Sequence, residues 1–473
     1  MAAVVLLFSS CEDFTDVQPK GKNLLTTTEQ LETLLNQEYD GCSNDMRLMA
    51  GDMIYAYSNI STLINRPVKS RAILIWTYDE ENMDRLADLT SSDDDYTKFY
   101  GYIGQIANPI LSKVDDATGT ESAKKALKAE ALTMRAWSLY VLVNKFAKAY
   151  NPSTAATDPG IINMTEDKDI QQSYAQSTVA EIYDQILSDI NQAIELDALP
   201  DVAVNKYRMN KPAAYAVKAL ALLNMQRWAE AEEAAKAALE INDAINDYFE
   251  SYIGTTYGYI EENEYTVIDR GLTGTEEDYF LNGNMEAFNC YTAETVANFE
   301  EGHVYYNGIE SGNMVTDYTM DYGEDMLGQA GFFVSHDLNS RWNDGGLRAP
   351  QMYLAIAECE LHQGNIDTAM DYLDQVREKR IDPEVYQPLA GNVTTTEEAI
   401  AHVKQVVMEE DLYSVNIFFD KKRWNQIDGW KATYSRVLDG KEYSIAPDSK
   451  MWIFPFPKSV INNNKFVKQN YNQ

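Results

Sequence analysis

The sequence predicts a mainly α-helical protein, in which helical hairpins of the tetratricopeptide type form a single large domain with a loop-rich face. Apolar residues recur at helical spacing over much of the 473-residue chain. Two distant segments repeat one hairpin pattern, and turn-forming residues are concentrated between them. The contents of hydrophobic residues (45%) and charged residues (24%) are typical of a folded globular protein.

Long amphipathic helices are expected in the first half of the chain. The segment 123–149 carries one apolar stripe at steps of three and four residues, formed by Leu132, Ala136, Leu139, Val143 and Phe146. Pro152 is a strong stop signal for this helix. Thr178, with Glu181 three residues later, forms a capping box in front of the next predicted helix.

The most diagnostic pattern is a repeated helical hairpin. The segments 212–240 and 350–378 each read as two helices joined by a short turn. An offset of 138 residues aligns Tyr215 with Tyr353, Ala219 with Ala357 and Ala231 with Ala369. Alanine at the crossing positions is typical of tetratricopeptide repeats. We therefore expect such hairpins over about 123–240 and 347–415.

Two irregular segments interrupt the helical pattern. The segment 241–345 is rich in Gly, Asn, Tyr, Asp and Thr, and its periodicity is weak. A loop-rich insert of this length inside a domain is usually functional. The segment 52–95 is a second irregular region, and it also contains several aromatic residues.

These irregular segments contain the candidate ligand-binding residues. Tyr and Trp offer flat, rigid surfaces that suit the apolar face of a sugar, and neighbouring Asn or Arg side chains suit its hydroxyl groups. We assign ligand binding to Trp76, Tyr78, Asn82, Arg85, Tyr279, Tyr291, Tyr305, Tyr306 and Trp342. Local packing is the alternative role for these residues. The aromatic residues of the helical segments are expected in the core, namely Trp137, Tyr140, Trp228 and Tyr353.

The charge balance argues against a nucleic-acid partner. The chain has 39 Lys and Arg residues against 74 Asp and Glu residues, and its net charge of −35 repels phosphate backbones. Such an acidic surface mainly predicts solubility, and attraction of cationic ligands is the functional alternative.

The N-terminus resembles the end of a bacterial lipoprotein signal. An apolar stretch is followed by two serines and then by Cys11. We expect residues 1–10 to be the remnant of the signal, Cys11 to carry the lipid and residues 11–23 to be a polar spacer. Residues 24–473 then form the domain. A disordered apolar N-terminus with an incidental cysteine is the alternative.

Enzyme signatures are absent from the sequence. The four histidines lie far apart without metal-ligand spacing, and no nucleophile elbow, phosphate-binding glycine loop or His-Glu-x-x-His motif is present. Adjacent acids such as Glu300-Glu301 and Glu409-Glu410 do not make a glycosidase dyad, which needs two carboxylates across a sugar. We expect no catalysis, cofactor or metal. The sequence does not decide whether Cys42 and Cys290 form a disulfide.

Five motifs, in the right order, resemble the SusD/RagB family of outer-membrane lipoproteins of Bacteroidota. They are Ala129 to Trp137 with Tyr140 and Phe146; Thr178 to Pro200; Leu347 to Pro350 with Ala357-Glu358; Phe419 to Trp424; and Ile453 to Pro457 with the closing Gln469-Asn470. Cys11 and its acidic spacer are similar to the family's N-terminus.

This resemblance implies a tetratricopeptide-like core with a variable loop face that meets the ligand. It also implies a lipid-anchored lid on the cell surface, which closes a nutrient into a SusC-like TonB-dependent outer-membrane transporter. An oligosaccharide is the expected ligand. The alternatives are a peptide-binding lid of the RagB type, a surface glycoside hydrolase, and a tetratricopeptide scaffold for protein partners alone.

Overall fold

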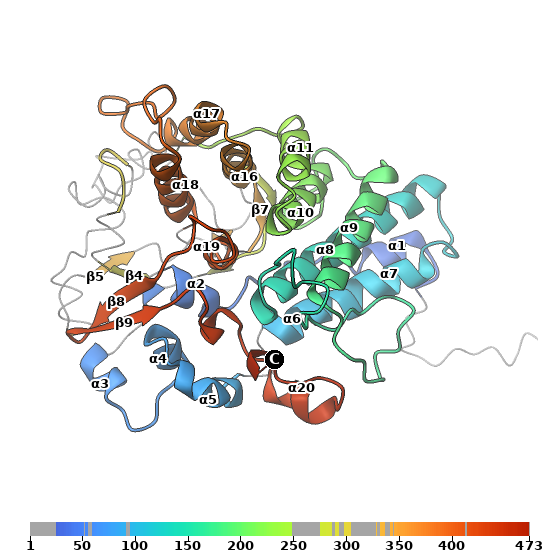
Figure 1. Ribbon diagram of the computed structural model, residues 1–473. Coiled ribbons are helices and arrows are strands. Elements are labelled where there is room, and N and C mark those ends of the chain that lie inside the picture. Colours follow the sequence, from blue (N-terminus) through green and yellow to red (C-terminus); the bar gives the residue numbers. More distant parts are fainter. Residues whose placement is uncertain are drawn as a thin grey trace, which may run out of the picture.

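The computed structural model describes most of the chain from residue 25 onward (Figure 1). The described residues are 25–51, 53–54, 59–90, 95–247, 275–285, 289–292, 298–303, 328, 332–335, 341–343, 345–411 and 414–472. Helices dominate them and pack into one domain, which confirms the predicted mainly α-helical fold class.

The long helices stack side by side along a curved path. Each packs against the next in the series α8 (Glu121–Phe146), α9 (Val179–Glu195), α10 (Lys211–Asn224), α11 (Trp228–Leu239), α16 (Ala349–His362), α17 (Ile366–Arg377) and α18 (Thr396–Glu410) (Figure 1). Helix α11 packs directly on α16, although the loop-rich insert separates them in the sequence. The insert therefore leaves this stack and returns to it without interrupting the packing.

Both repeated hairpins are present at the predicted positions, as α10–α11 and α16–α17. The alanines of the repeat are fully buried, namely Ala219, Ala231, Ala357 and Ala369. Their small side chains allow neighbouring helices to approach closely. Of the aromatic residues expected in the core, Trp228 is only partly buried, and its ring stacks on that of His362 with the centroids 3.9 Å apart.

Side-chain caps explain where these helices begin. At α9, Thr178 Oγ1 accepts a hydrogen bond from the Glu181 amide (3.2 Å), and the Glu181 carboxylate accepts one from the Thr178 amide (2.8 Å), so the predicted capping box is confirmed. At α10, the Asn210 side chain accepts a hydrogen bond from the Ala213 amide (2.8 Å). Pro212 occupies the first turn, where its missing N–H costs nothing.

Two groups of shorter helices complete the N-terminal half. The group that packs on α8 consists of α1 (Thr28–Glu32), α6 (Asp95–Tyr102), the π-helical turn η3 (Ile103–Ala107) and α7 (Asn108–Lys113). The second group consists of α2 (Asp45–Ala50), α3 (Ile60–Ile64), α4 (Arg71–Trp76), η2 (Glu80–Asn82) and α5 (Met83–Asp88). In Figure 1, α3, α4 and α5 lie toward the lower edge and α2 lies nearer the centre.

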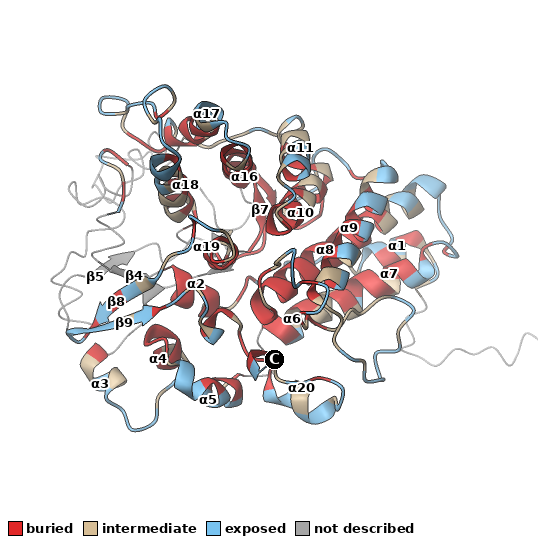
Figure 2. Cartoon of the chain, in the orientation of Figure 1, coloured by how far each residue is buried: buried red, intermediate tan, exposed pale blue. Residues whose placement is uncertain are grey.

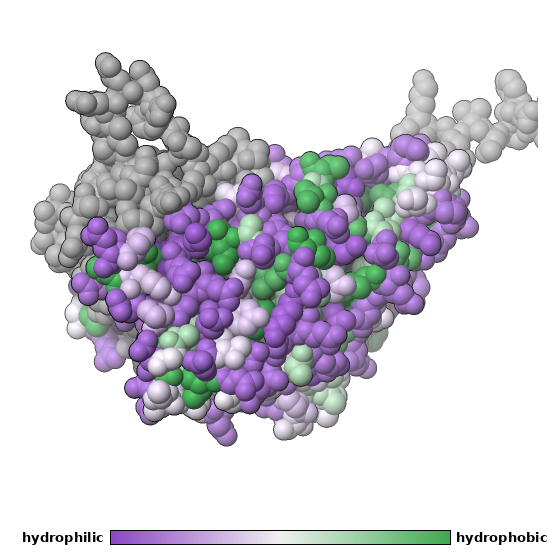
Figure 3. Space-filling model, turned by 90° about the horizontal axis from the view of Figure 1, so that it is seen from above, coloured by the Kyte–Doolittle hydropathy of each residue, from purple (hydrophilic) through white to green (hydrophobic). Residues whose placement is uncertain are grey.

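The C-terminal elements are α19 (Asn416–Trp424), the hairpin of β8 (Tyr434–Leu438) and β9 (Lys441–Ile445), η4 (Lys450–Trp452), α20 (Lys458–Asn463) and η5 (Asn470–Asn472). Helix α19 lies within the curve and also contacts α2 (Figure 1). Buried residues gather where these elements face one another (Figure 2). The face shown in Figure 3 is mainly hydrophilic, with scattered apolar groups.

The remaining strands of the described residues are short and antiparallel. A three-stranded sheet has the order β1 (Met53–Ile54), β4 (Asn289–Thr292), β5 (Phe332–Ser335). Two further pairs are β2 (Asp278–Phe280) with β7 (Leu347–Arg348), and β3 (Asn284–Met285) with β6 (Arg341–Trp342).

Helix α8 ends inside the protein at Phe146, before the stop that Pro152 predicts. The ammonium group of Lys422 on α19 donates hydrogen bonds to the carbonyls of Asn144 (2.6 Å) and Ala147 (2.5 Å). A cation at this position also interacts favourably with the negative end of the helix dipole. Residues far away in the sequence therefore help to determine where α8 ends.

Two other C-terminal residues complete the cap of α8. The Phe454 amide donates a hydrogen bond to the Lys145 carbonyl (3.1 Å). The side-chain amide of Asn470 donates one to the Phe146 carbonyl (2.6 Å) and another to the Phe454 carbonyl (2.7 Å). Two of the motifs that resemble the SusD/RagB family, at 453–457 and 469–470, thus act as caps for one buried helix end.

We predict that Asn470→Ala lowers the free energy of unfolding by about 2–3 kcal/mol, because it leaves two buried carbonyls without a donor. Urea titration followed by circular dichroism measures this change. Asn463→Ala is the matched control, since Asn463 is exposed at the end of α20 and should change stability by less than about 0.5 kcal/mol. Equal stability of the two variants would contradict the capping role.

Candidate functional site

An antiparallel ribbon within the loop-rich insert connects the insert to the helical stack. Its outgoing arm consists of β2, β3 and β4, and its returning arm consists of β5, β6 and β7. The ribbon begins beside α10 and α16, where β2 and β7 contact the helical stack. At its other end, β4 pairs with β1, so Met53 lies opposite Tyr291. The two irregular segments predicted from the sequence therefore meet in one sheet.

The side chain of Asn343 fixes the base of this ribbon. Its Oδ1 accepts a hydrogen bond from the Asn282 amide (2.9 Å), and its Nδ2 donates to Asp278 Oδ1 (2.7 Å) and to the Phe280 carbonyl (3.0 Å). These bonds replace regular strand pairing at the point where the register between β2 and β7 shifts.

Two glycines allow the base to pack tightly against the core. A Cβ atom at Gly346 would lie 2.2 Å from the Phe280 carbonyl oxygen, and one at Gly345 would lie 2.4 Å from Asn282 Oδ1. The indole N–H of Trp137 on α8 donates a hydrogen bond to the Gly345 carbonyl (3.2 Å). The base of the ribbon is therefore anchored to the longest helix of the described structure.

The ribbon brings together three of the nine predicted ligand-binding positions, Tyr279, Trp342 and Tyr291, in order from its base outward. The Tyr279 side chain is fully buried at the base and donates a hydrogen bond to the Asn242 carbonyl (2.5 Å). The side chains of Trp342 and Tyr291 lie outside the described part of the structure, although the backbone places both residues on the ribbon.

Trp76 and Tyr78, two further predicted residues, are buried in the N-terminal group of helices. Trp76 is 1% exposed. Tyr78 adopts a left-handed backbone (φ 45°), and its ring packs against the guanidinium of Arg436 on β8, 4.6 Å from the ring centroid. Arg436 also donates hydrogen bonds to the carbonyls of Leu48 (2.8 Å) and Met49 (3.0 Å). In this conformation, Tyr78 joins α2 to the β8–β9 hairpin.

Asn82 and Arg85, by contrast, are exposed on η2 and α5. The Asn82 amide donates a hydrogen bond to Asp79 Oδ1 (2.8 Å). The last two predicted residues, Tyr305 and Tyr306, lie outside the described residues, as does Cys11.

An open groove of about 290 Å³ lies next to the segment that carries Asn82 and Arg85. Its walls come from residues 148–158, 422–426 and 447–453 and from Tyr471. Two hydrogen bonds connect these walls to the segment: Ser449 Oγ donates to the Glu80 carboxylate (2.6 Å), and the Tyr471 hydroxyl donates to Asp84. Sequence reasoning missed this groove, because its residues come from separate segments without a shared motif.

Three lysines and two aspartates line the groove, within a strongly acidic protein. Lys148 forms an ion pair with Asp158 (2.8 Å) at one side, and the exposed Lys450 lies at another. Burial lowers the pKa of Lys422, which lines the inner wall, to about 7. Trp452 contributes an apolar surface. Polar groups around an aromatic residue suit a small hydroxylated ligand.

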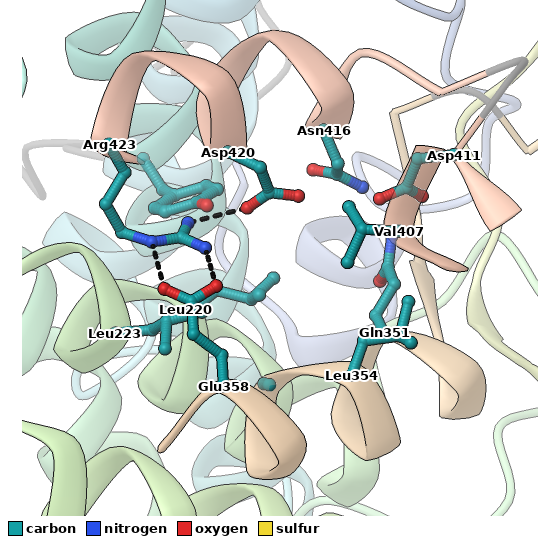
Figure 4. Close-up of a pocket in the computed structure, with 12 residues that line it drawn as sticks. Leu220, Leu223, Gln351, Leu354, Glu358, Val407, Asp411, Asn416, Asp420 and Arg423 are labelled. Carbon is teal, nitrogen blue, oxygen red and sulfur yellow. Dashed lines mark hydrogen bonds and ion pairs between the residues drawn. The ribbon is translucent and has the colours of Figure 1, made fainter. Parts of the chain in front are cut away.

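A buried cluster of charges lies elsewhere, between α16 and α19 (Figure 4). The Arg423 guanidinium donates two hydrogen bonds to the Glu358 carboxylate (3.1 and 2.6 Å), and Trp424 Nε1 donates a third (3.0 Å). Although burial acts to raise the pKa of Glu358, the Arg423 charge outweighs it and lowers that pKa to about 2. This ion pair joins two of the motifs that resemble the SusD/RagB family, at 357–358 and 419–424.

Two other carboxylates beside this ion pair do not form a glycosidase dyad. Burial raises the pKa of Asp411 and of Asp420, and the neighbouring Asp420 charge adds to the effect at Asp411. Such shifted acids occur in active sites. The cavity that they line has only about 20 Å³ for an occupant, room for roughly one water molecule and not for a sugar ring.

Neither a metal-binding cluster nor a membrane-spanning helix is found among the described residues. No group of three or more His, Cys, Asp or Glu side chains in this part of the chain is arranged to hold a metal ion. The helices of the described ranges are too short or too polar to cross a bilayer.

We predict that Gly346→Ala disrupts the ribbon base, because its added Cβ would overlap the Phe280 carbonyl oxygen. Stability should fall by about 2 kcal/mol or more, a typical cost of overpacking with backbone strain. Thermal unfolding measures this effect. In the control Gly101→Ala, the Cβ meets nothing within 4 Å in α6, and helix propensity should add up to about 1 kcal/mol of stability.

We predict that the stability contributed by Glu358 is present at neutral pH and is lost in acid. Its pKa is about 2 in the folded chain and about 4.3 when unfolded, so this contribution falls as the pH drops from about 5 to 2. Glu358→Gln should cost about 3–5 kcal/mol at pH 7, because the buried Arg423 loses its bidentate carboxylate and keeps only the hydrogen bond to Asp420. The exposed Glu397→Gln should cost under about 0.5 kcal/mol.

Urea unfolding at pH 3, 5 and 7 separates the wild type from Glu358→Gln. The difference between them should shrink toward pH 3. A constant difference across this range would contradict the lowered pKa.

Comparisons with known proteins agree with this architecture. A SusD-like family model, described as starch-binding and associating with the outer membrane, matches residues 13–223, and a SusD family model matches residues 342–472. The longest unmatched stretch, 224–341, contains nearly all of the loop-rich insert. None of the curated proteins compared with the chain matches it.

Solved structures share the fold across nearly the whole chain at low sequence identity. A putative sugar-binding protein from Bacteroides vulgatus has a TM-score of 0.67 and 16% identity, with coverage of 94% of this chain and 98% of its own. A SusD superfamily protein from Bacteroides thetaiotaomicron has a TM-score of 0.65 and 17% identity, with coverage of 94% and 99%.

A SusD-like carbohydrate-binding protein from Bacteroides vulgatus has a TM-score of 0.58 and 16% identity, with coverage of 93% and 97%. These likenesses support the fold, and the two family models, which match both halves of the helical scaffold in order, support the family. The chain belongs to the SusD/RagB family.

Proposed function

We propose that this protein captures oligosaccharides at the cell surface and delivers them, as a lid, to a SusC-like TonB-dependent outer-membrane transporter. Membership of a family described as starch-binding and associating with the outer membrane is the observation that carries this proposal. In this proposal, residues 1–10 are a signal remnant, Cys11 carries the lipid anchor, residues 11–23 are the spacer and residues 24–473 form the binding domain.

We place the ligand on the side of the domain that the ribbon carries. The ribbon joins both irregular segments, and it holds Trp342 and Tyr291 at fixed backbone positions. The segment unmatched by either family model, 224–341, includes Tyr305 and Tyr306 as well. A scaffold that the family models match, carrying an insert that they do not match, suits a loop face that is adapted to a particular ligand.

Because the protein is strongly acidic, a peptide is the second candidate ligand. With a net charge of −35, the protein attracts cationic peptides more than neutral sugars. Charge attraction of this kind weakens as salt screens it, whereas stacking of a neutral sugar on an aromatic ring does not. Salt dependence therefore distinguishes the two ligand classes.

We predict that the full chain in detergent binds neutral oligosaccharides with an affinity that salt changes little. Trp342→Ala should weaken binding about tenfold, the effect of losing one aromatic stacking contact. Isothermal titration calorimetry with glycan and basic-peptide panels measures both effects. Phe466→Ala is the control, since Phe466 is an exposed aromatic residue of the C-terminal segment.

Three results would contradict parts of this proposal. Binding of basic peptides alone would favour the peptide lid. Release of reducing sugar from the glycans would favour a hydrolase. Binding that survives Trp342→Ala but is lost in Lys450→Ala would move the ligand from the ribbon to the groove beside Asn82 and Arg85.

A further inference from the structure

A small polar cavity lies at the junction of α10, α16, α18 and α19 (Figure 4). It has about 20 Å³ for an occupant, and its apolar wall includes Leu220, Leu354 and Val407. Its polar wall includes Gln351, Asp411, Asn416 and Asp420, which surround the same space in Figure 4, and the Glu358–Arg423 ion pair lies beside them.

Two amide nitrogens of this wall, Gln351 Nε2 and Asn416 Nδ2, are buried and form no hydrogen bond within the described part of the chain. Asp411 Oδ1 has only a long ion-pair contact with Arg348 Nη2 (3.5 Å). Gln351 is 5% exposed and Asp411 is 2% exposed, so bulk water does not solvate them. Buried donors without partners are destabilising, and two beside one cavity indicate an occupant that pairs with them.

The orientation of Gln351 restricts what this occupant can be. Its Oε1 accepts a hydrogen bond from the Arg348 amide (3.0 Å), so the other end of the side-chain amide, an N–H₂ donor, is the group left over. The occupant must therefore accept a hydrogen bond. It must also pair with the carboxyl groups of Asp411 and Asp420, which accept a hydrogen bond when ionised and can donate one when protonated.

Positive charge is already present next to both carboxylates. Arg348 Nη2 lies 3.5 Å from Asp411 Oδ1, and Arg423 Nη1 donates a hydrogen bond to Asp420 Oδ1 (2.6 Å). A metal cation would meet these guanidinium groups and the N–H₂ of Gln351, which repel it. A neutral molecule that both donates and accepts fits the cavity better.

We propose that one ordered water molecule occupies this cavity as part of the native fold. It accepts hydrogen bonds from Gln351 Nε2 and Asn416 Nδ2. It exchanges hydrogen bonds with the carboxyl groups of Asp411 and Asp420. Four partners and a space of about one water molecule match what buried waters in proteins require.

This water connects three helices beside the Arg423–Glu358 ion pair, which already joins α16 to α19. Gln351 belongs to α16, Asp411 follows the last residue of α18, and Asn416 and Asp420 belong to α19. The same α19 carries Lys422, which caps α8, and Arg423, which pairs with Glu358. The water site thus contributes to holding the helix on which two other buried contacts depend.

A high-resolution crystal structure of the full chain tests the proposal directly. We expect a single density peak about 2.6–3.2 Å from the four named side chains. An empty cavity, or a direct hydrogen bond from Asn416 to Asp411 that closes it, would overturn the proposal. So would a peak with several oxygen contacts of about 2.0–2.6 Å, which indicates a cation.

A variant distinguishes water from a cation in solution. Gln351→Glu keeps an acceptor for the Arg348 amide and replaces the donor with a second carboxylate oxygen. For a water site, we expect the melting temperature at pH 7.5 to fall by about 3 °C or more, with no response to added Na⁺, K⁺, Mg²⁺ or Ca²⁺. In the control Gln192→Glu, an exposed position on α9, it should change by less than about 1 °C.

Two solution results would overturn the water site. The first is a melting temperature of Gln351→Glu that rises with one of these cations. The second is an unchanged melting temperature relative to Gln192→Glu. Neither result bears on sugar binding at the ribbon, so this proposal and the proposed function fail independently.

Discussion

Helix α8 runs through the interior of the protein, and its polar groups must find partners there rather than in water. Its C-terminal carbonyls are satisfied by Lys422, Phe454 and Asn470, which follow it by some 280 residues or more. An unsatisfied carbonyl in this position would cost about 1–3 kcal/mol. The closing segment of the chain therefore has to fold back onto α8 before the helix is complete.

Charged side chains of α8 extend the same constraint to other elements. Arg135 forms a bidentate pair with Asp189 on α9 (2.7 and 2.7 Å), and Lys145 pairs with Asp95 on α6 (2.5 Å). Glu130 accepts two hydrogen bonds from Arg208 (2.5 and 2.7 Å). Buried pairs add little net stability, but removal of one partner is costly. The main effect of these ion pairs is to favour a single arrangement of the helices around α8.

The sequence predicted those parts of the fold that have a local signature. Periodic apolar residues, the capping box at Thr178 and the alanines of the repeated hairpins depend on neighbours a few residues apart. The ribbon depends instead on strands of two to four residues that pair across a long insert. Such pairing produces no periodic pattern of residues in the local sequence.

The candidate site was harder to predict for a related reason. The same aromatic residue types serve packing and ligand contact, and Trp76, Tyr78 and Tyr279 are buried in this conformation. Their burial depends on tertiary partners such as Arg436, which no local pattern connects to Tyr78. Asn82 and Arg85 are exposed, and ligand contact at all nine positions stays a prediction.

The direct packing of α11 on α16 gives the loop-rich insert an unusual freedom to diverge. Because the helical stack closes behind the insert, and Asn343 with Gly345 and Gly346 fixes the base of the ribbon, the insert is not needed to connect α11 to α16. The insert still contributes to the domain at residues 298–303, where the Arg377 guanidinium on α17 donates two hydrogen bonds to the Glu300 carboxylate (2.8 and 2.5 Å). Changes in the insert outside such contacts alter the loop face while the order of the helices stays the same.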